Sequence, residues 1–318
     1  MLQHKQKLII FIPAYNEEKT ITEVIRKIPK NLAGVEQEII VVDDGSTDNT
    51  VKKVQSIGVK VISHHENLGL GKTFSTIVRI ALEKRADVVI TIDADLQFNP
   101  AEIPKLANPI IQKKADFVTG TRFVNCNQQE IPMFRLLGNK LIARFISWVC
   151  KRKFTDVSCG FRVYSRKALF YLNIINNFTY THEVILTLSF KGLRMLEKPI
   201  KVKYYTNRKS HVTGNIILYI LKTLRIIFQV IIDYKPFHVF GLLGITLFTA
   251  GVLLDISMLF IYFNIGQFTP YKIIGVAGIV FNFLGIISFF TGVYMSVLSR
   301  IRRNQEESLY YQKKNFYD

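Results

Sequence analysis

The chain has 318 residues, a net charge of +18 and a hydrophobic share of 49%. That length holds one sizeable domain and a further part, and the apolar excess indicates that the further part is a membrane segment. The three cysteines, an odd number without metal or redox spacing, exclude a disulfide framework and indicate reduced thiols facing the cytosol.

Residues 1–120 alternate between strand and helix patterns. Apolar runs at 7–12, 38–42, 60–63, 87–93 and 115–120 predict five strands, and apolar residues at 74, 77, 78, 81 and 82 share one helical face. The run LIIFI before Pro13 is too short for the apolar core of a signal peptide, so a first strand is the better interpretation. This alternation predicts an α/β fold with a doubly wound, mostly parallel sheet.

Polar motifs follow each predicted strand. They read PAYNEE, DDGSTD, NLGLGK, DADLQ and GTRF. Parallel sheets bind ligands beyond the carboxyl ends of their strands, so all five motifs are expected at the ligand-binding edge. That agreement between motifs and fold is stronger evidence for a site than any single motif.

The glycine-rich motif has two interpretations. Gly71-Lys72-Thr73 resembles the end of a P-loop, but a P-loop needs a glycine where this chain has Glu66. A phosphate-binding site of the P-loop type is therefore excluded. The remaining turn suits either close approach of the backbone to a ligand or chain reversal alone. Lys72 is counted among the residues expected to bind a nucleotide.

The DADLQ motif indicates a metal. Asp93 and Asp95 alternate along an extended segment, so their carboxylates converge only if the chain turns at Ala94 and Leu96. With Gln97 they offer hard oxygen ligands, which suit Mg²⁺ or Mn²⁺ and do not suit zinc. The motif predicts a divalent ion with coordination positions left open for substrate phosphates.

The C-terminal third predicts a membrane hairpin. Residues 237–263 and 271–298 are each long enough to cross ~30 Å of hydrocarbon as a helix. Cations precede the first span and follow the second, whereas the connection carries only Lys272, so both termini are expected in the cytoplasm. The segment 211–236 is apolar nearly all round but has Lys222 and Arg225 in its middle, which favours a helix lying in the membrane interface over a third span.

Glycines repeat every seven residues within the two spans, at Gly244 and Gly251 and then at Gly278, Gly285 and Gly292. Small residues on one face let helices approach closely. The partner of this face is either the other span or another subunit, so a homo-oligomer is one expectation. Asp255 is expected near the far membrane interface and is not assigned a function.

The motifs PAYNEE, VVDDGSTD, NLGLGK, DADLQ, GTRF and SCGFRVYSR, in this order, resemble those of inverting family 2 glycosyltransferases with the GT-A fold. With its membrane hairpin the chain looks most like the polyprenyl-phosphate glycosyltransferases, of the dolichol-phosphate mannose synthase type. The resemblance covers residues 8–200 by motif. We expect a cytoplasmic GT-A domain at 1–210, an amphipathic helix at 211–236, the hairpin at 237–300 and a basic cytoplasmic tail at 301–318.

The resemblance implies a role for each matching residue. The residues implied for nucleotide binding are Pro13, Ala14, Tyr15 and Glu17 at the nucleoside, Asp43 and Asp44 at the base or ribose, and Asp93 through water or ribose contacts. The implied ligands of the metal on the diphosphate are Asp93, Asp95 and Gln97. Arg122 and Arg135 match arginines that bind the lipid phosphate, and Arg162 matches a basic residue close to the phosphates.

Elementary chemistry agrees with these roles. Breaking the sugar–diphosphate bond creates negative charge, which a metal ion and cations stabilise. A lipid phosphate is already ionised, so it needs arginines to bring two anions together more than it needs a base. Glu183 would act as a base only if the acceptor were a hydroxyl. The family's G-x-S-K segment is absent, and Arg208 and Lys209 stand in its place.

The sequence therefore predicts transfer of one sugar from a UDP- or GDP-sugar to dolichyl or undecaprenyl phosphate, with inversion, at the cytoplasmic face of an anionic membrane. The positive charge suits that membrane and the two anionic substrates, and no nucleic acid is expected as a partner. One alternative is transfer to a hydroxyl of a lipid-linked glycan or cell-wall polymer. Another is a non-catalytic membrane subunit, against which the intact Asp93, Asp95 and Gln97 argue.

Overall fold

The computed structural model describes residues 5–30, 32, 34–123, 133–174, 180–203 and 216–317, with the backbone alone for 133–137, 216–220, 222 and 223. The chain forms two compact units. The first comprises Met1–Ile227 and Tyr310–Asp318, and the second comprises Phe228–Leu309.

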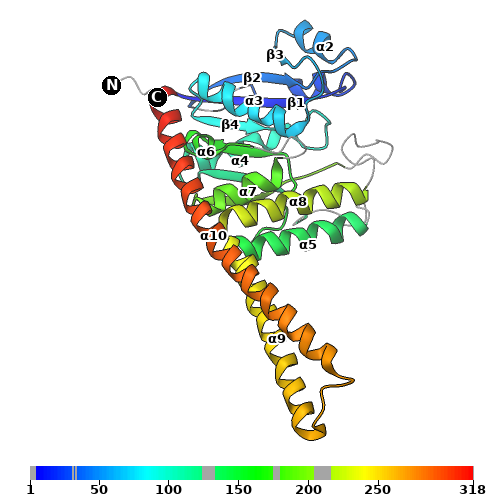
Figure 1. Ribbon diagram of the computed structural model, residues 1–318. Helices are drawn as coiled ribbons and strands as arrows, with labels where there is room; N and C mark the ends of the chain where they lie inside the picture. Colours follow the sequence, from blue (N-terminus) through cyan, green and yellow to red (C-terminus); the bar gives the residue numbers. More distant parts are fainter. Residues whose placement is uncertain are drawn as a thin grey trace. The chain divides into compact units, whose positions relative to one another are not determined.

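A seven-stranded mixed sheet forms the centre of the first unit (Figure 1). In spatial order its strands are β3 (Lys60–Ser63), β2 (Val35–Asp43), β1 (Gln6–Ala14), β4 (Val88–Thr91), β6 (Arg162–Ser165), β5 (Phe117–Thr121) and β7 (Met195–Pro199). Neighbouring strands are parallel, except that β6 runs antiparallel to both β4 and β5. The predicted α/β class with a mostly parallel sheet is confirmed.

The helices of the first unit cover both faces of this sheet (Figure 1). They are α1 (Ile21–Lys27), α2 (Thr50–Ser56), α3 (Leu70–Glu83), the 3₁₀ turn η1 (Pro100–Glu102), α4 (Ile103–Ile111), α5 (Met133–Cys150), α6 (Arg166–Tyr171), α7 (Thr181–Phe190) and most of α8 (Ile216–Tyr234). The helical face predicted at 74, 77, 78, 81 and 82 is buried throughout. Because both sheet faces are covered, the central strand β1 has five consecutive fully buried apolar residues, at 8–12.

The strand order places the ligand edge. β1 pairs with β2 on one side and with β4 on the other, so the direction in which strands are added reverses between β1 and β4. Ligands of open α/β sheets bind outside the carboxyl ends of the strands at such a switch point. The motifs that begin at Pro13 and at Asp93 leave the sheet on either side of this point.

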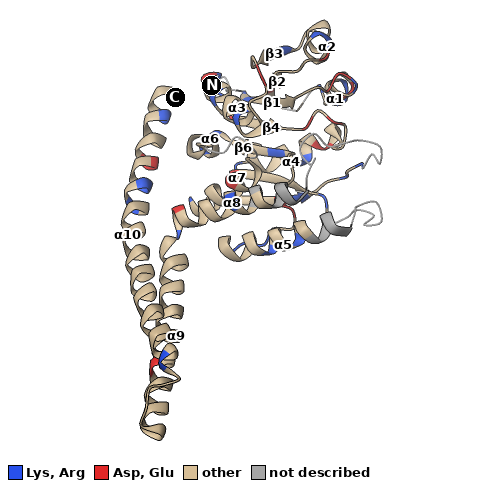
Figure 2. Cartoon of the chain, turned by 45° about the vertical axis from the view of Figure 1, so that its right-hand side comes forward, with Lys and Arg blue, Asp and Glu red and all other residues tan. Residues whose placement is uncertain are grey.

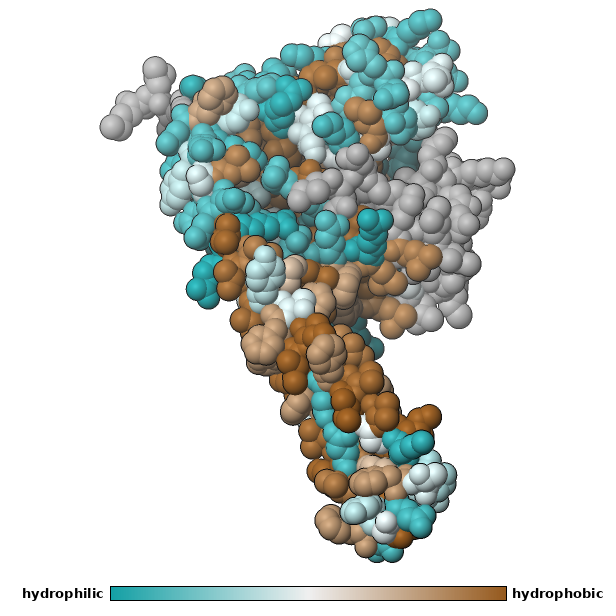
Figure 3. Space-filling view, viewed as in Figure 1, coloured by the Kyte–Doolittle hydropathy of each residue, from teal (hydrophilic) through white to brown (hydrophobic). Residues whose placement is uncertain are grey.

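The second unit contains the hairpin of α9 (Pro236–Ile265) and the greater part of α10 (Lys272–Tyr317). Among the described residues these are the two helices long and apolar enough to cross a membrane, and α8 is not one of them. Apolar side chains cover most of the visible surface of the hairpin, and charged side chains are sparse there (Figures 2 and 3). The two predicted spans are confirmed as candidate membrane helices.

The glycines of the two spans face each other. A Cβ added at Gly285 would lie 2.7 Å from the backbone nitrogen of Phe248, and one at Gly244 would lie 2.6 Å from that of Phe289. The glycine face therefore packs on the other span of the same chain, which is one of the two partners expected for it, and a homo-oligomer stays a prediction. Asp255 also faces this seam, where it accepts a hydrogen bond from Asn282 Nδ2 at 2.6 Å.

The tail after the second span continues as helix to Tyr317, and its last residues belong to the first unit. There the ring of Tyr310 stacks on Tyr171 of α6 with a centroid separation of 4.3 Å. Lys313 Nζ donates to the carbonyl of Leu172 at 2.9 Å. The structure thus divides the chain at 227 and 309, whereas the expected divisions lie at 210, 236 and 300.

Candidate active site

Two loops at the carboxyl edge of the sheet are joined by hydrogen bonds. The backbone N–H of Asn16, after β1, donates to Ser46 Oγ after β2 at 2.9 Å, and that of Glu17 donates to Thr50 Oγ1 at 2.8 Å. Asn16 has a left-handed backbone with φ of 55°, which asparagine tolerates better than most residues. These contacts build one wall of the edge from two motifs of the sequence.

The residues implied for the nucleoside lie along this wall. Pro13 and Ala14 end β1 and are buried, whereas Tyr15 and Glu17 are half-buried in the loop that follows. Thr20 Oγ1 donates to Glu17 Oε2 at 2.9 Å and thereby orients that carboxylate. The structure thus brings all four residues to one edge, where backbone and side chains together can line a pocket.

Asp43 and Asp44 differ in what they contact. Both carboxylate oxygens of Asp43 lie 3.3 Å from the backbone nitrogen of Ser46. Asp44 lies 2.8 Å from His64 Nδ1 and accepts from the backbone N–H of Gly69 at 2.9 Å. Asp44 is buried, and its carboxylate holds the glycine-rich turn. It is therefore placed to shape the pocket, and its contact with the base or ribose stays a prediction.

The glycine-rich turn leads directly into α3. Gly69, the residue before the helix, has φ of 91°, and Lys72 is exposed in the first helical turn. The turn packs tightly on its neighbour, because a Cβ at Gly45 would lie 2.5 Å from the carbonyl carbon of Glu66. Chain reversal is present here, and the loop that contains Gly45 packs closely on this turn. Approach of the turn's backbone to a ligand stays a prediction.

The DADLQ segment turns where the convergence of its carboxylates requires it. Leu96 has a left-handed φ of 61°, and the backbone N–H of Gln97 donates to Asp95 Oδ1 at 3.1 Å. A Cβ added at Gly160 would lie 2.6 Å from both carboxylate oxygens of Asp93. Only glycine at position 160 leaves room for Asp93 in this geometry.

The pKa of Asp93 depends on its burial and on the charged groups around it at this edge. Burial, and after it the negative charge of Asp95, raise the pKa of Asp93 to about 7, while Arg122 and Arg162 act in the opposite direction and Glu17 adds to the rise. These five groups, from β1 to β6, therefore lie within electrostatic reach of one another. The four motifs that carry these groups therefore lie near one another.

The carboxylates of Asp93 and Asp95 suit a divalent cation that the protein holds with few ligands. Among the described residues no group of three or more His, Cys, Asp and Glu side chains is arranged to hold a metal without a substrate. The pair Asp93 and Asp95 is instead a half-buried pair of carboxylates whose mutual repulsion a cation would relieve. Two carboxylates with few other ligands suit Mg²⁺ or Mn²⁺, which bind through one or two carboxylates and substrate phosphates.

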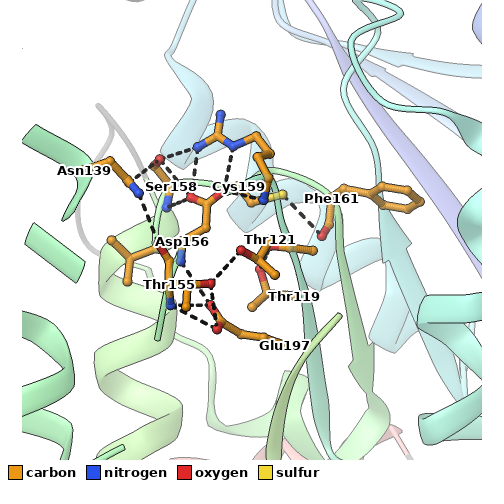
Figure 4. Close-up of polar contacts among 12 residues, drawn as sticks. Thr119, Thr121, Asn139, Thr155, Asp156, Ser158, Cys159, Phe161 and Glu197 are labelled. Carbon is orange, nitrogen blue, oxygen red and sulfur yellow. Dashed lines mark hydrogen bonds and ion pairs between the residues drawn. The ribbon is translucent and has the colours of Figure 1, made fainter. Parts of the chain in front are cut away.

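Arg122 directly follows β5 and is held by the buried carboxylate of Asp156, which is labelled in Figure 4. Its Nε donates to Asp156 Oδ2 at 2.6 Å, and its Nη2 donates to Asp156 Oδ1 at 2.9 Å and to Ser158 Oγ at 2.6 Å. Burial alone would raise the pKa of Asp156, but the charge and hydrogen bonds of Arg122 outweigh it and lower the pKa. The side chain of Arg122 is 16% exposed, so an anion can still approach it.

A second layer of residues holds this pair in place. Glu197 on β7 accepts from the backbone N–H groups of Thr155 and Asp156 at 3.0 and 3.1 Å. Asn139 on α5 donates to the carbonyl of Thr155 at 3.3 Å and accepts from Ser158 Oγ at 3.1 Å. These residues were not predicted from the sequence. The acid in TDVSCG, directly before a recognised motif, was the one available signal.

Arg162 lies inside the fold. It is fully buried on β6, and its guanidinium donates to the carbonyls of Cys159, Thr181 and Val157 at 2.7, 2.8 and 3.1 Å. A guanidinium so engaged would act on the phosphates through its charge, and its place close to them stays a prediction. Within the protein, Arg162 holds the loop before β6 and adds positive charge near Asp93.

The remaining predicted residues lie elsewhere. The side chain of Arg135, in the first turn of α5, and the residues Arg208 and Lys209 lie outside what the structure describes. Glu183 and His182 are buried at the start of α7. Burial first, and then the charge of Arg162, lower the pKa of His182 to about 3, so this imidazole is neutral near pH 7.

A mixed α/β sheet with paired carboxylates at its switch point, and with an arginine within electrostatic reach of them, is typical of glycosyltransferases of the GT-A class. The chain belongs to glycosyl transferase family 2, because residues 9–170 match the sequence pattern of that family. The resemblance inferred from the motifs is therefore confirmed, and the protein is an enzyme.

The relatives are similar over much of the chain. It is 32% identical to UDP-N-acetylglucosamine–dolichyl-phosphate N-acetylglucosaminyltransferase of Methanococcus voltae, over 62% of this chain and 86% of that protein. It is 28% identical to dolichol-phosphate mannosyltransferase of Pyrococcus furiosus, over 82% and 73%. It is 26% identical to undecaprenyl-phosphate 4-deoxy-4-formamido-L-arabinose transferase of Proteus mirabilis, over 93% and 92%.

A solved structure shows the same fold. Glucosyl-3-phosphoglycerate synthase from Mycobacterium tuberculosis, crystallised with Mn²⁺, UDP and phosphoglyceric acid, is similar with a TM-score of 0.58 and 20% identity, over 71% of this chain and 78% of that one. At this identity the likeness establishes the GT-A fold.

Proposed function

We propose that the protein transfers a single sugar from a UDP- or GDP-sugar to a polyprenyl phosphate, dolichyl or undecaprenyl, at the cytoplasmic face of a membrane. The observation that carries the proposal is that an acidic pair, Asp93 and Asp95, and the carboxylate-held Arg122 lie within electrostatic reach of one another at the carboxyl edge of the sheet. The acidic pair suits a metal-bound diphosphate, and the arginine suits a second phosphate. Named relatives that act on dolichyl and undecaprenyl phosphates support the choice of acceptor.

In this reaction Asp95 and Gln97 would hold the Mg²⁺ or Mn²⁺ directly, with Asp93 behind them. When bound, the cation neutralises the diphosphate as it leaves. The wall formed by Pro13, Ala14, Tyr15 and Glu17 would bind the nucleoside. Asp43 lies on the same edge for a ribose or base contact, and the exposed Lys72 is placed for the nucleotide's charge. A homologue of the fold crystallised with Mn²⁺ and UDP supports this choice of cofactor and donor.

The acceptor would be bound by Arg122, with Arg135 as a second cation. A phosphate oxygen of the lipid attacks the anomeric carbon, the bond from that carbon to the diphosphate breaks, and the nucleoside diphosphate leaves from the opposite face. Attack opposite to the leaving group inverts the anomeric centre. Because the acceptor oxygen is already ionised, no residue is needed to remove a proton.

A donor screen tests the proposal. Membranes containing the protein are incubated with labelled UDP- and GDP-sugars and polyprenyl phosphate, and the label in the lipid extract is measured with and without EDTA. We expect a lipid product with at least one donor, lost with EDTA and in Asp95→Asn, and retained in the matched exposed control Glu36→Gln. Absence of a lipid product from every donor would contradict the function, and full transfer in EDTA would contradict the metal.

A further inference from the structure

His64, directly after β3, contacts both aspartates of the DDGSTD motif. Its backbone N–H donates to the carbonyl of Asp43 at 2.9 Å, and its ring Nδ1 lies 2.8 Å from Asp44 Oδ1. Because a carboxylate only accepts hydrogen bonds, Nδ1 is the donor in this contact. The side chains of His64 and Asp44 are 11% and 7% exposed. A satisfied polar contact with so little exposure to water holds both partners in one orientation.

The other ring nitrogen of His64 contacts α3. Nε2 lies 3.0 Å from Oγ1 of Thr76, a residue that is buried. When Nδ1 carries the ring proton, Nε2 accepts from the Thr76 hydroxyl, so both nitrogens have a partner. The imidazole therefore joins the loop after β2 to the helix that follows the glycine-rich turn.

Asp44 in turn holds the glycine-rich turn itself. Its two carboxylate oxygens accept from the backbone N–H groups of Leu68 and Gly69, at 3.1 and 2.9 Å. Its own backbone N–H donates to the carbonyl of Ala14 at 2.8 Å, in the wall implied for the nucleoside. His64 thus supports a residue that joins the ends of β1 and β2 to the glycine-rich turn.

We infer that His64 is a positioning residue of the nucleotide site, which acts through Asp43 and Asp44 and does not itself touch the nucleotide. The hydrogen bond from Nδ1 keeps the Asp44 carboxylate oriented, and that carboxylate keeps the glycine-rich turn at the edge where Asp43 is expected to contact the base or ribose. The inference rests on the proposed function, because it names a residue that sets the affinity for the nucleoside diphosphate. Attack by the lipid phosphate does not depend on this contact.

Two substitutions at this position separate the two ring nitrogens. The amide nitrogen of His64→Asn takes the place of Nδ1, whereas the longer side chain of His64→Gln brings its amide nitrogen to the place of Nε2. Only His64→Asn therefore retains the donor to Asp44. His65→Gln, at the exposed neighbouring histidine, is the matched control.

Nucleotide binding is measured first, because it needs no catalysis. Calorimetry gives the dissociation constants of UDP and of GDP, each with Mn²⁺, for the full protein in detergent, at a temperature at which every variant is folded. With a sugar donor of the more tightly bound nucleotide, kcat and the KM values of donor and acceptor are then determined.

We expect the dissociation constant to rise about tenfold in His64→Gln, as is usual when a charged group loses a hydrogen bond, and the donor KM to rise with it. His64→Asn and His65→Gln should bind the nucleotide as the parent protein does. The values of kcat and of the acceptor KM should be unchanged in all three variants, because a merely structural defect would affect both substrates.

Unchanged nucleotide binding in His64→Gln would overturn the inference, and so would an equal loss of binding in His64→Asn. A fall of kcat or a rise of the acceptor KM without weaker nucleotide binding would also overturn it. Failure of the parent protein to bind either nucleotide would contradict the proposed function and the inference together. A parent that binds, with variants that all bind equally well, would contradict the inference alone.

Discussion

At the active-site edge, the absence of a side chain at Gly160 leaves the space that the carboxylate of Asp93 occupies. Gly160 precedes β6 by two residues, and the fully buried Arg162 adds positive charge near the same carboxylate. Arg122 is positioned by Asp156 in the same manner, through contacts within the protein. The geometry of the groups expected to meet substrate therefore depends on residues that never touch it.

Gly160→Ala should displace Asp93, because its Cβ would lie 2.6 Å from both carboxylate oxygens. We expect transfer to fall about tenfold to a hundredfold, as is usual when a metal ligand loses its support, and to need a higher Mn²⁺ concentration. The measurement is a Mn²⁺ titration of transferase activity. Gly138→Ala on α5 is the matched control, since nothing lies within 4 Å of its Cβ. Unchanged Mn²⁺ dependence in Gly160→Ala would contradict the assignment.

Asp156→Asn should weaken both the fold and its response to acid. The pKa of Asp156 is lowered in the folded protein, so its stabilisation is complete above the unfolded pKa of about 4 and is lost as the pH falls through the lower folded value. Removing one charge of a buried pair costs about 3 kcal/mol or more. Thermal unfolding in detergent, followed from neutral to acid pH, should show a lower midpoint temperature in the variant and a smaller fall of that midpoint as the pH decreases. An equal fall in the variant and the parent protein would contradict the stabilising role of the Asp156 carboxylate.

At the scale of elements, long patterns were predictable and short or non-local ones were not. The five predicted strands appear as β1 to β5, and the α3 face is buried as its period indicated. The strands β6 and β7, of four and five residues, carry no long apolar run, and their pairing depends on distant partners. The turn at Leu96 could be predicted, whereas the role of Arg122 stays a prediction. The network of Asn139, Asp156 and Glu197 could not be predicted, because it joins three separate elements or loops.

The glycine seam of the hairpin gives an element-scale prediction. Gly285→Leu would force the two spans apart, because even a Cβ there lies 2.7 Å from the backbone of Phe248. We expect the detergent-solubilised variant to lose its fold at a lower temperature than the parent, by several degrees for a loss of about 1–2 kcal/mol. Val276→Leu, on an exposed position of the same helix, is the control. Equal melting of both variants would show that the seam does not hold the hairpin.

For the whole molecule, we expect the two candidate spans, joined by a short loop, to leave both chain ends on the same side of a membrane. The cations on the flanks of the hairpin favour the cytoplasmic side. Tags at residues 1 and 318 should both be digested by protease in inside-out vesicles and protected in right-side-out vesicles, with the reverse for a tag inserted after Gly266. Opposite sidedness of the two termini would contradict the two-span topology.

The proposed reaction requires that a lipid phosphate, and not a hydroxyl, attacks the sugar. The most direct measurement supplies one active nucleotide sugar together with either a polyprenyl phosphate or the polyprenol of the same length. We expect transfer to the phosphate alone, and a far smaller loss of activity in Glu183→Gln than in Arg122→Ala. Transfer to the polyprenol or to a glycan hydroxyl, abolished by Glu183→Gln, would contradict it.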